Sequence, residues 1–413
     1  MPTSTNTAPL PPLSLYVHIP WCVRKCPYCD FNSHTSEQSL PETQYVQALI
    51  ADLTLEVQTH TVTHRPLHSI FFGGGTPSLF SAQAIGDIID AAKNILGFAN
   101  HIEITLEANP GTAEYTHFGA LKHAGINRLS LGVQSFNDEH LHTLGRIHSS
   151  AEAFNAFKLA RQAGIDNINL DLMHGLPNQT PLQATSDIRQ AIALEPEHIS
   201  WYQLTVEPNT VFYNAPPALP NDDALADIQD AGEALLAHHN FLQYEVSAYC
   251  QPGKQAKHNL NYWHFGDYLG IGAGAHSKLT HATGQITRHR KTRLPADYLA
   301  NKHHAIGISP ITPDRLPLEF MMNALRQPQG FETPLFQAMT GLPLTTIQPI
   351  LHALSQQGLI LHTPQFIRTT ALGFRFLNTV LSAFDQSCLP AKTSNNSPEN
   401  SAYNHIASDK THL

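Results

Sequence analysis

Short apolar runs alternate with amphipathic stretches through the first half of the chain, an order typical of parallel βα units. Six runs of four to eight residues predict strands: Leu15–Ile19, Ser69–Phe72, His101–Glu107, Arg128–Val133, Asn167–Met173 and His198–Thr205. The stretches between them have helical spacing: Pro41–Gln58, Ala82–Leu96, Thr112–Ala124, Ala151–Ala163 and Leu182–Leu194. Polar motifs fall repeatedly just after the strands, where an active barrel mouth lies. We therefore predict an α/β fold with a partial (β/α)6 barrel.

The pattern changes in the second half. An acidic helix at Asn221–His238 and a strand at Gln243–Tyr249 precede a glycine-rich segment, Gly266–Ser277. From Leu316 the predicted order is helix, short helix, helix, small hairpin (358–369) and last helix (372–383), as in a winged-helix module. The predicted regions are therefore a barrel at 14–215, a barrel extension at 216–308 and a mainly helical winged-helix-like domain at 309–385. The polar tails, 1–13 and 386–413, are predicted to be disordered.

Charge narrows the range of partners. The 413 residues include 24 Lys+Arg and 33 Asp+Glu, a net charge of −9 with neutral His. This sign opposes binding to nucleic acid through its phosphates, so we expect no nucleic-acid partner and a protein-docking role for the C-terminal domain. The first fourteen residues lack the basic and apolar regions of a secretory signal, and the expected location is the cytoplasm.

The strongest chemical signal is a C-x3-C-x2-C loop directly after the first predicted strand. Cys22, Cys26 and Cys29 together can bind three irons of a 4Fe-4S cluster and leave the fourth iron open to another ligand. The neighbouring aromatic residues Tyr28 and Phe31 fit a cluster shielded from solvent. A Cys3His zinc site is the alternative, with a nearby histidine, His18 or His34, as the fourth ligand.

This loop resembles the hallmark of the radical S-adenosylmethionine (SAM) superfamily. The next strand ends in FFGGGTP (71–77), which resembles the segment that binds the SAM ammonium in that superfamily, although a glycine triplet alone is also a simple tight turn. The later motifs EANP, LGVQSF and DLMHGLPNQT resemble the coproporphyrinogen-oxidase-like branch. Matching these motifs implies SAM contacts by Tyr16, Gly74, Gly75, Thr76, Glu107, Gln134, Arg146 and Asp171. Carboxylates accept hydrogen bonds, so Glu107 and Asp171 are candidates for the methionine amine or the ribose hydroxyls.

Within that branch, two features resemble the HemW-type haem chaperones. Phe31 occupies the position of a fourth cysteine found in the decarboxylating oxidase, and the chain carries HNLNYW at 258–263, with FMMNALR downstream. The resemblance implies haem contacts by His258, Asn259, Tyr262 and Trp263. The residues alone also allow a packed core in which His258 makes a satisfied hydrogen bond. His264, His276 and the thiol of Cys250 are competing iron ligands.

Two functions follow from the resemblance. The first is a haem chaperone with a 4Fe-4S cluster and exchangeable SAM, which passes haem to an acceptor apo-haemoprotein such as a membrane-associated respiratory enzyme and receives electrons from a donor. The alternative is oxygen-independent coproporphyrinogen III oxidase, in which a radical formed from SAM drives decarboxylation of propionates. A nucleic-acid-modifying radical enzyme fits the negative charge poorly.

Overall fold

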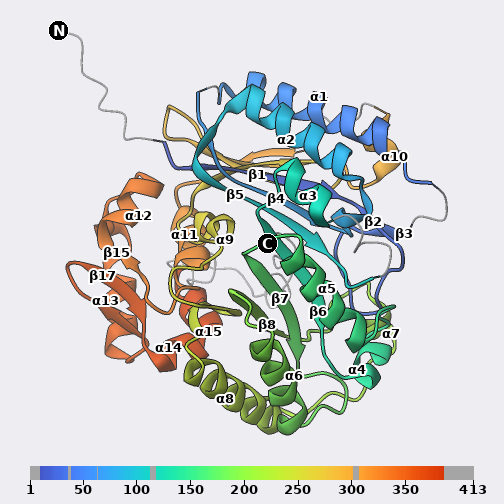
Figure 1. Cartoon of the computed structure of the whole chain (residues 1–413). Helices are drawn as coiled ribbons and strands as arrows, with labels where there is room; N and C mark the ends of the chain where they lie inside the picture. Colours follow the sequence, from blue (N-terminus) through green and yellow to red (C-terminus); the bar gives the residue numbers. More distant parts are fainter. Residues whose placement is uncertain (1–9, 36–38, 63, 112–117, 301–306, 386–413) are drawn as a thin grey trace.

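A computed structural model describes residues 10–35, 39–62, 64–111, 118–300 and 307–385. Its centre is one mixed sheet of twelve strands (Figure 1). Six neighbouring strands are parallel and follow chain order: β1 (Leu13–Ile19), β4 (Leu67–Gly74), β5 (Phe98–Ala108), β6 (Arg128–Gln134), β7 (Ile168–His174) and β8 (His198–Gln203). This arrangement confirms the α/β class and the predicted partial barrel.

Helices between these strands cover the outside of the sheet (Figure 1): α1 (Glu42–His60), α2 (Ala82–Leu96), α3 (Phe118–Ala124), α4 (Asp138–Thr143), α5 (Ser150–Gln162) and α6 (Pro181–Ala193). Local sequence fixes two starts, because Ser149 with Glu152 and Thr180 with Gln183 form capping boxes. Apolar side chains of the strands and helices form the main buried core. The first part of the predicted helix Thr112–Ala124 lies outside the described residues. No helix in the described ranges has the length and apolar character needed to cross a membrane.

The sheet extends beyond β1 through the glycine-rich segment. Strand β11 (Asp267–Ile271) pairs in parallel with β1, and β12 (His276–Thr280), β13 (Ile286–Arg290) and β14 (Gly307–Pro310) continue antiparallel. β1 is therefore an interior strand, paired with β11 on one edge and β4 on the other. Glycine is required at position 270 of β11, because a Cβ there would lie 1.9 Å from the carbonyl oxygen of His276.

The opposite edge differs from the sequence prediction. The strand predicted at Gln243–Tyr249 is wrong, because the segment forms two antiparallel strands, β9 (Leu242–Glu245) and β10 (Ala248–Cys250). The side chain of Glu245 accepts hydrogen bonds from the backbone N–H and hydroxyl of Ser247, which stabilises the turn. β10 pairs with β8, while α7 (Val211–Asn214) and α8 (Asp222–His238) fill the connection.

The C-terminal region has its own apolar core, centred on Phe320 and Phe336. It contains α11 (Leu316–Ala324), α12 (Thr333–Thr340), α13 (Gln348–Gln356) and a small sheet of β15 (Phe331–Glu332), β17 (Phe366–Thr369) and β16 (Ile360–His362). The predicted last helix is instead two short helices, α14 (Ala371–Arg375) and α15 (Leu377–Ser382), because Phe376 leaves helical geometry with ψ 41°. The mainly helical C-terminal domain is confirmed.

Candidate functional site

The cysteine loop begins where β1 ends. Two short strands, β2 (Trp21–Cys22) and β3 (His34–Thr35), pair with each other and close its base. Cys22, Cys26 and Cys29 are free and partly buried. Burial raises the pKa of the Cys22 and Cys29 thiols, so a bound metal must supply the charge that holds them as thiolates. Phe31 is 45% exposed, so its ring shields little of the loop in this structure.

The donor set argues against the zinc alternative. Four tetrahedral ligands about 2.3 Å from zinc lie about 3.8 Å from one another. Among the described residues, the cysteine sulfurs do not belong to any group of three potential ligand atoms within 4.8 Å. His18 is also engaged at both ring nitrogens, with Tyr16 Oη at 3.1 Å and the carbonyl oxygen of Asn32 at 2.9 Å. His34 retains a buried Nε2 without a hydrogen-bond partner. Three thiols on one loop that are not gathered into one compact ligand group fit a cluster, whose cysteines bind separate irons.

The glycine turn at the end of β4 packs against this loop. Gly74 has φ +115°, and a Cβ on Gly75 would lie 2.4 Å from the carbonyl oxygen of Trp21. The N–H of Gly75 donates to Ile19 O and that of Thr76 to Trp21 O. These two residues therefore fasten the glycine turn to the cysteine loop, a structural role that the sequence could not separate from ligand binding.

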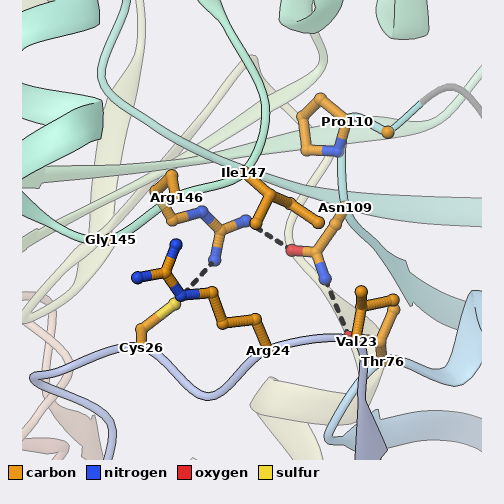
Figure 2. Close-up of a pocket in the computed structure, with 10 residues that line it drawn as sticks. Val23, Arg24, Cys26, Thr76, Asn109, Pro110, Gly145, Arg146 and Ile147 are labelled. Atoms are coloured by element: carbon orange, nitrogen blue, oxygen red, sulfur yellow. Dashed lines mark hydrogen bonds between the residues drawn. The ribbon is translucent and has the colours of Figure 1, made fainter. Parts of the chain in front are cut away.

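A hydrogen-bonded chain connects the third and fourth βα units to the cluster loop (Figure 2). Arg146 Nη1 donates to Cys26 Sγ at 3.6 Å, and Arg146 Nη2 donates to Asn109 Oδ1 and to the carbonyl oxygen of Gly132. Asn109 Nδ2 donates to Thr76 Oγ1 at 2.8 Å. Cys26, Thr76, Asn109 and Arg146 line one pocket, and Arg146 Nε is buried there without a protein partner. A pocket with a cation and a spare donor suits an anionic group.

Two carboxyl groups lie deeper in the barrel mouth. Glu107 Oε2 accepts from the N–H of Gly74 at 3.3 Å, whereas Asp171 accepts from Ser130 and Asn169, both at 2.8 Å. Burial, followed by the charge of Asp171, raises the pKa of Glu107 to about 8. Burial also raises the pKa of Asp171. A bound cationic group would favour ionised carboxylates here and is the ligand type that this pair suits.

Gln134 ends β6 with φ +71°, an uncommon conformation for a residue other than glycine. Its Oε1 accepts from Tyr202 Oη at 2.8 Å. Tyr202 and Asn109 were not among the predicted SAM contacts. The sequence does contain a signal for both residues. Tyr202 lies at the end of the sixth parallel strand, which supplied no predicted contact, and Asn109 belongs to the EANP motif. Tyr16 lies nearby on β1, with its ring stacked on Phe71 at 6.3 Å.

The HNLNYW segment forms α9 (Lys257–Trp263), which packs on β1 and β4 near their starts. His258 is 2% exposed and both of its ring nitrogens are occupied. Nδ1 lies 2.8 Å from Ser69 Oγ, and Nε2 lies 3.0 Å from Tyr262 Oη. Glu103 accepts the backbone N–H of His258 at 3.0 Å. This geometry favours the alternative in which His258 is a satisfied core residue, because an iron ligand needs a free ring nitrogen.

The other residues considered for haem are equally enclosed or lie apart. Trp263 is 2% exposed and carries Arg326 over its ring at 4.5 Å, whereas Asn259 is half-buried. Cys250 is fully buried, and burial raises the pKa of its thiol to about 11, as for a small apolar core residue. His264 is exposed at the end of α9, and His276 is half-buried on β12. The residues proposed for SAM and for haem meet at one ring, because Phe71 stacks on Tyr16 at 6.3 Å and on His258 at 5.1 Å.

Comparisons with known proteins agree with this architecture. Residues 16–191 match the model of the radical SAM superfamily, and residues 311–376 match that of the HemN C-terminal domain. The solved structure of HemN, a coproporphyrinogen III oxidase and radical SAM enzyme from Escherichia coli, superposes with a TM-score of 0.77 at 22% identity and covers 92% of both chains. That likeness shows the fold.

Sequence relatives are more specific. The haem chaperone HemW of Haemophilus influenzae is 51% identical over 377 residues, covering 91% of this chain and 98% of the relative. HemW of Escherichia coli K12 is 48% identical over 375 residues, with coverage of 91% and 98%. HemW of Bacillus subtilis is 35% identical over 383 residues, with coverage of 90% and 98%. Because this similarity spans nearly the whole of each relative, the chain belongs to the HemW family of haem chaperones within the radical SAM superfamily.

Proposed function

We propose that the chain binds haem and transfers it to an acceptor apo-haemoprotein, with a 4Fe-4S cluster and exchangeable SAM as resident cofactors. The observation that carries this proposal is the near full-length similarity to relatives named haem chaperones. Phe31 supports it, because the fourth cysteine associated with the decarboxylating oxidase is absent from this chain. A membrane-associated respiratory enzyme is the proposed class of acceptor, and an electron donor is needed to reduce the cluster.

The barrel mouth supplies what the cofactors require. Cys22, Cys26 and Cys29 hold the cluster, which when reduced provides one electron for cleavage of SAM. Arg146 donates to Cys26 Sγ and lowers the cost of negative charge on that ligand. Asn109 fixes the guanidinium between the cluster loop and Thr76.

The remaining mouth residues orient and enclose SAM. Glu107 and Asp171 accept hydrogen bonds from its cationic or hydroxyl groups, and Gln134 is held in position by Tyr202. The polar ring of the mouth consists of Glu107, Gln134, Arg146 and Asp171, all of them buried or half-buried. Because the site is partly closed to water, each of these interactions is stronger.

Haem binding through α9 requires a change from the structure described here. For His258 to bind iron, its contact with either Ser69 or Tyr262 must break, and the buried ring must become accessible through a movement of α9. His264, exposed at the end of the same helix, offers a route that leaves the core intact. We therefore keep both histidines as proposed ligands, together with contacts from Asn259, Tyr262 and Trp263.

A haem-transfer assay tests the chaperone function. The haem-loaded protein is mixed with an apo-haemoprotein, and the acceptor's absorbance is followed with wild type, His258→Ala and His264→Ala. Transfer by the wild type faster than from free haem supports the proposal. Failure to transfer haem to any acceptor would overturn it. If a variant still binds haem tightly, the histidine that it lacks is not the iron ligand.

The alternative function is coproporphyrinogen III decarboxylation, which the intact cysteine loop and polar ring favour because a simple carrier needs neither. Anaerobic protein is incubated with SAM, reductant and coproporphyrinogen III, and both 5′-deoxyadenosine and the porphyrinogen products are measured. Deoxyadenosine without decarboxylated product supports the chaperone with a live radical site. Many turnovers of decarboxylation would make this chain an oxidase.

A further inference from the structure

Three histidines meet at the far end of α1 from the cysteine loop. His60 is the last residue of α1, His281 lies just after β12, and His289 is on β13. The first turn of the same helix contacts the loop region through Tyr45, whose hydroxyl donates to His18 O. His60 lies 15 residues after Tyr45 on α1, so the histidine cluster (His60, His281 and His289) lies about 22 Å away along the helix.

The ligand atoms of these three side chains lie within 4.8 Å of one another. Glu56, one turn before His60, adds an oxygen: its Oε2 lies 3.7 Å from His60 Nε2 and 3.7 Å from His289 Nδ1. Glu56 Oε2 and His289 Nδ1 are both buried and have no hydrogen-bond partner. At 3.7 Å these two atoms are too far apart for a good hydrogen bond with each other, and an ion bound between them would satisfy both.

Neighbouring residues orient the cluster. Thr287 Oγ1 lies 2.8 Å from His281 Nε2 and 2.8 Å from His289 Nε2. A hydroxyl has one proton, so at least one of these rings donates through Nε2 and keeps its lone pair on Nδ1. Lys291 Nζ takes the other oxygen of Glu56, at 2.6 Å, and leaves Oε2 facing the histidines. Ligand histidines and carboxylates typically have outer partners of this kind.

Charge at the cluster also suits a cation. Two carboxyl groups, those of Glu56 and Asp52, face the single ammonium of Lys291, which contacts them at 2.6 and 2.5 Å. The extra acidic group leaves negative charge beside the three imidazoles. The side chain of His60 is 7% exposed, so the cluster reaches solvent mainly through His281, which is half-buried.

We propose that His60, His281, His289 and Glu56 form a binding site for a divalent transition-metal ion, with Zn2+ as the best match. Three imidazole nitrogens and one carboxylate oxygen suit zinc, and tetrahedral ligands about 2.05 Å from it lie about 3.3 Å apart. The 3.7 Å contacts of Glu56 are close to that spacing, so small side-chain rotations complete the site. The ion joins the end of α1 to the β12–β13 hairpin and acts as a structural clamp.

The test measures zinc binding by the full-length chain with Cys22, Cys26 and Cys29 replaced by serine, which removes the competing thiols. Zn2+ is titrated in the presence of a chelating dye, and Co2+ absorption reports the ligand type. We expect one equivalent of Zn2+, a Co2+ spectrum without sulfur charge-transfer bands, and a higher melting temperature with zinc. His289→Gln should weaken binding by more than about 100-fold, and Thr287→Val by about 10–100-fold.

A matched control separates this site from adventitious binding to the protein's 26 histidines. His142, exposed on α4, is replaced by glutamine and should leave the affinity unchanged. His281→Gln, at a partly exposed position, provides a mild second variant, and circular dichroism without zinc verifies that each variant is folded. Equal zinc affinity in the His289, His281 and His142 variants, or no retained zinc in the parent that carries the three serines, would overturn the proposal.

Discussion

The two ends of the barrel interior are built in opposite ways. At the mouth, where the parallel strands end, Arg146 Nε lacks a protein partner, Gln134 has a positive φ, and Glu107 has a strongly raised pKa. At the other end, α9 makes tight contacts, with both ring nitrogens of His258 satisfied. Ser69, which contacts His258, and Gly74 at the mouth are five residues apart on β4, about 16 Å.

This difference distinguishes a site prepared for a ligand, at the mouth, from a helix that closes the other end of the barrel as part of the fold, α9. Unsatisfied donors and shifted carboxyls cost stability and persist where a ligand relieves them. The His258 network, in contrast, is paired with Ser69 and Tyr262, and paired networks rigidify a fold, although Trp263 Nε1 on the same helix is buried without a hydrogen-bond partner.

Replacing Cys22, Cys26 and Cys29 together by alanine should abolish the cluster, because no described histidine or carboxylate joins them in a compact ligand group. Iron content and the visible absorption of the anaerobically reconstituted protein measure this. Haem binding should survive, since α9 lies at the other end of the barrel. Loss of haem binding together with the cluster would mean that the two ends are coupled.

Replacing His258 by alanine should destabilise the fold by about 3 kcal/mol, since it leaves Ser69 and Tyr262 unpaired and opens a cavity. Thermal unfolding without haem measures the effect. Asn259→Ala, in the same helix but half-buried, is the control and should change stability by much less. An unchanged melting temperature for His258→Ala would show that the contacts of His258 in α9 do not stabilise the fold.

Glu107→Gln should remove a pH dependence of stability in the SAM-free protein. The folded carboxyl titrates near pH 8 instead of its usual 4.5, so the folded state binds an extra proton between those values. Stability is therefore full below about pH 4.5 and falls as pH rises towards 8. Chemical denaturation at pH 6 and pH 8.5 measures the slope. The variant should show a smaller fall than wild type and weaker SAM binding; equal slopes would refute the shift.

Arg326→Met should cost about 1 kcal/mol. Arg326 in the C-terminal domain lies over Trp263 of α9 and pairs with Glu245 at 3.1 Å. Arg375 also joins this domain to the barrel extension, through Asp230, but that pair is 64% and 58% exposed. Arg375→Met should therefore have almost no effect on thermal unfolding. An equal loss of stability in the two variants would mean that the exposed Arg375–Asp230 pair holds the C-terminal domain as strongly as the contacts of Arg326 do.

The parallel strands were predictable because each is a buried apolar run bounded by turns. The antiparallel strands were harder: β12 and β13 carry polar residues such as Lys278 and His289, which are buried beside Asp267 and Glu56 from outside those two strands. The cysteine loop and most polar strand ends were also identified. The burial and hydrogen bonding of His258 could not be predicted, because HNLNYW has the same composition in a core and in a haem site. The contacts that hold His258 in the core come from Ser69 and Glu103, which belong to other βα units.

The interior position of β1 has a consequence for synthesis of the chain. One edge of β1 pairs with β4 soon after it is made, whereas the other pairs with β11, which begins at Asp267. During translation, this apolar edge stays open until most of the protein has emerged, and such edges promote aggregation. The cysteine loop follows β1 directly, and Asn32 Nδ2 is held by the carbonyl oxygen of Ala273, just beyond β11. Iron delivered before Ala273 has left the ribosome would therefore meet a loop without its final support.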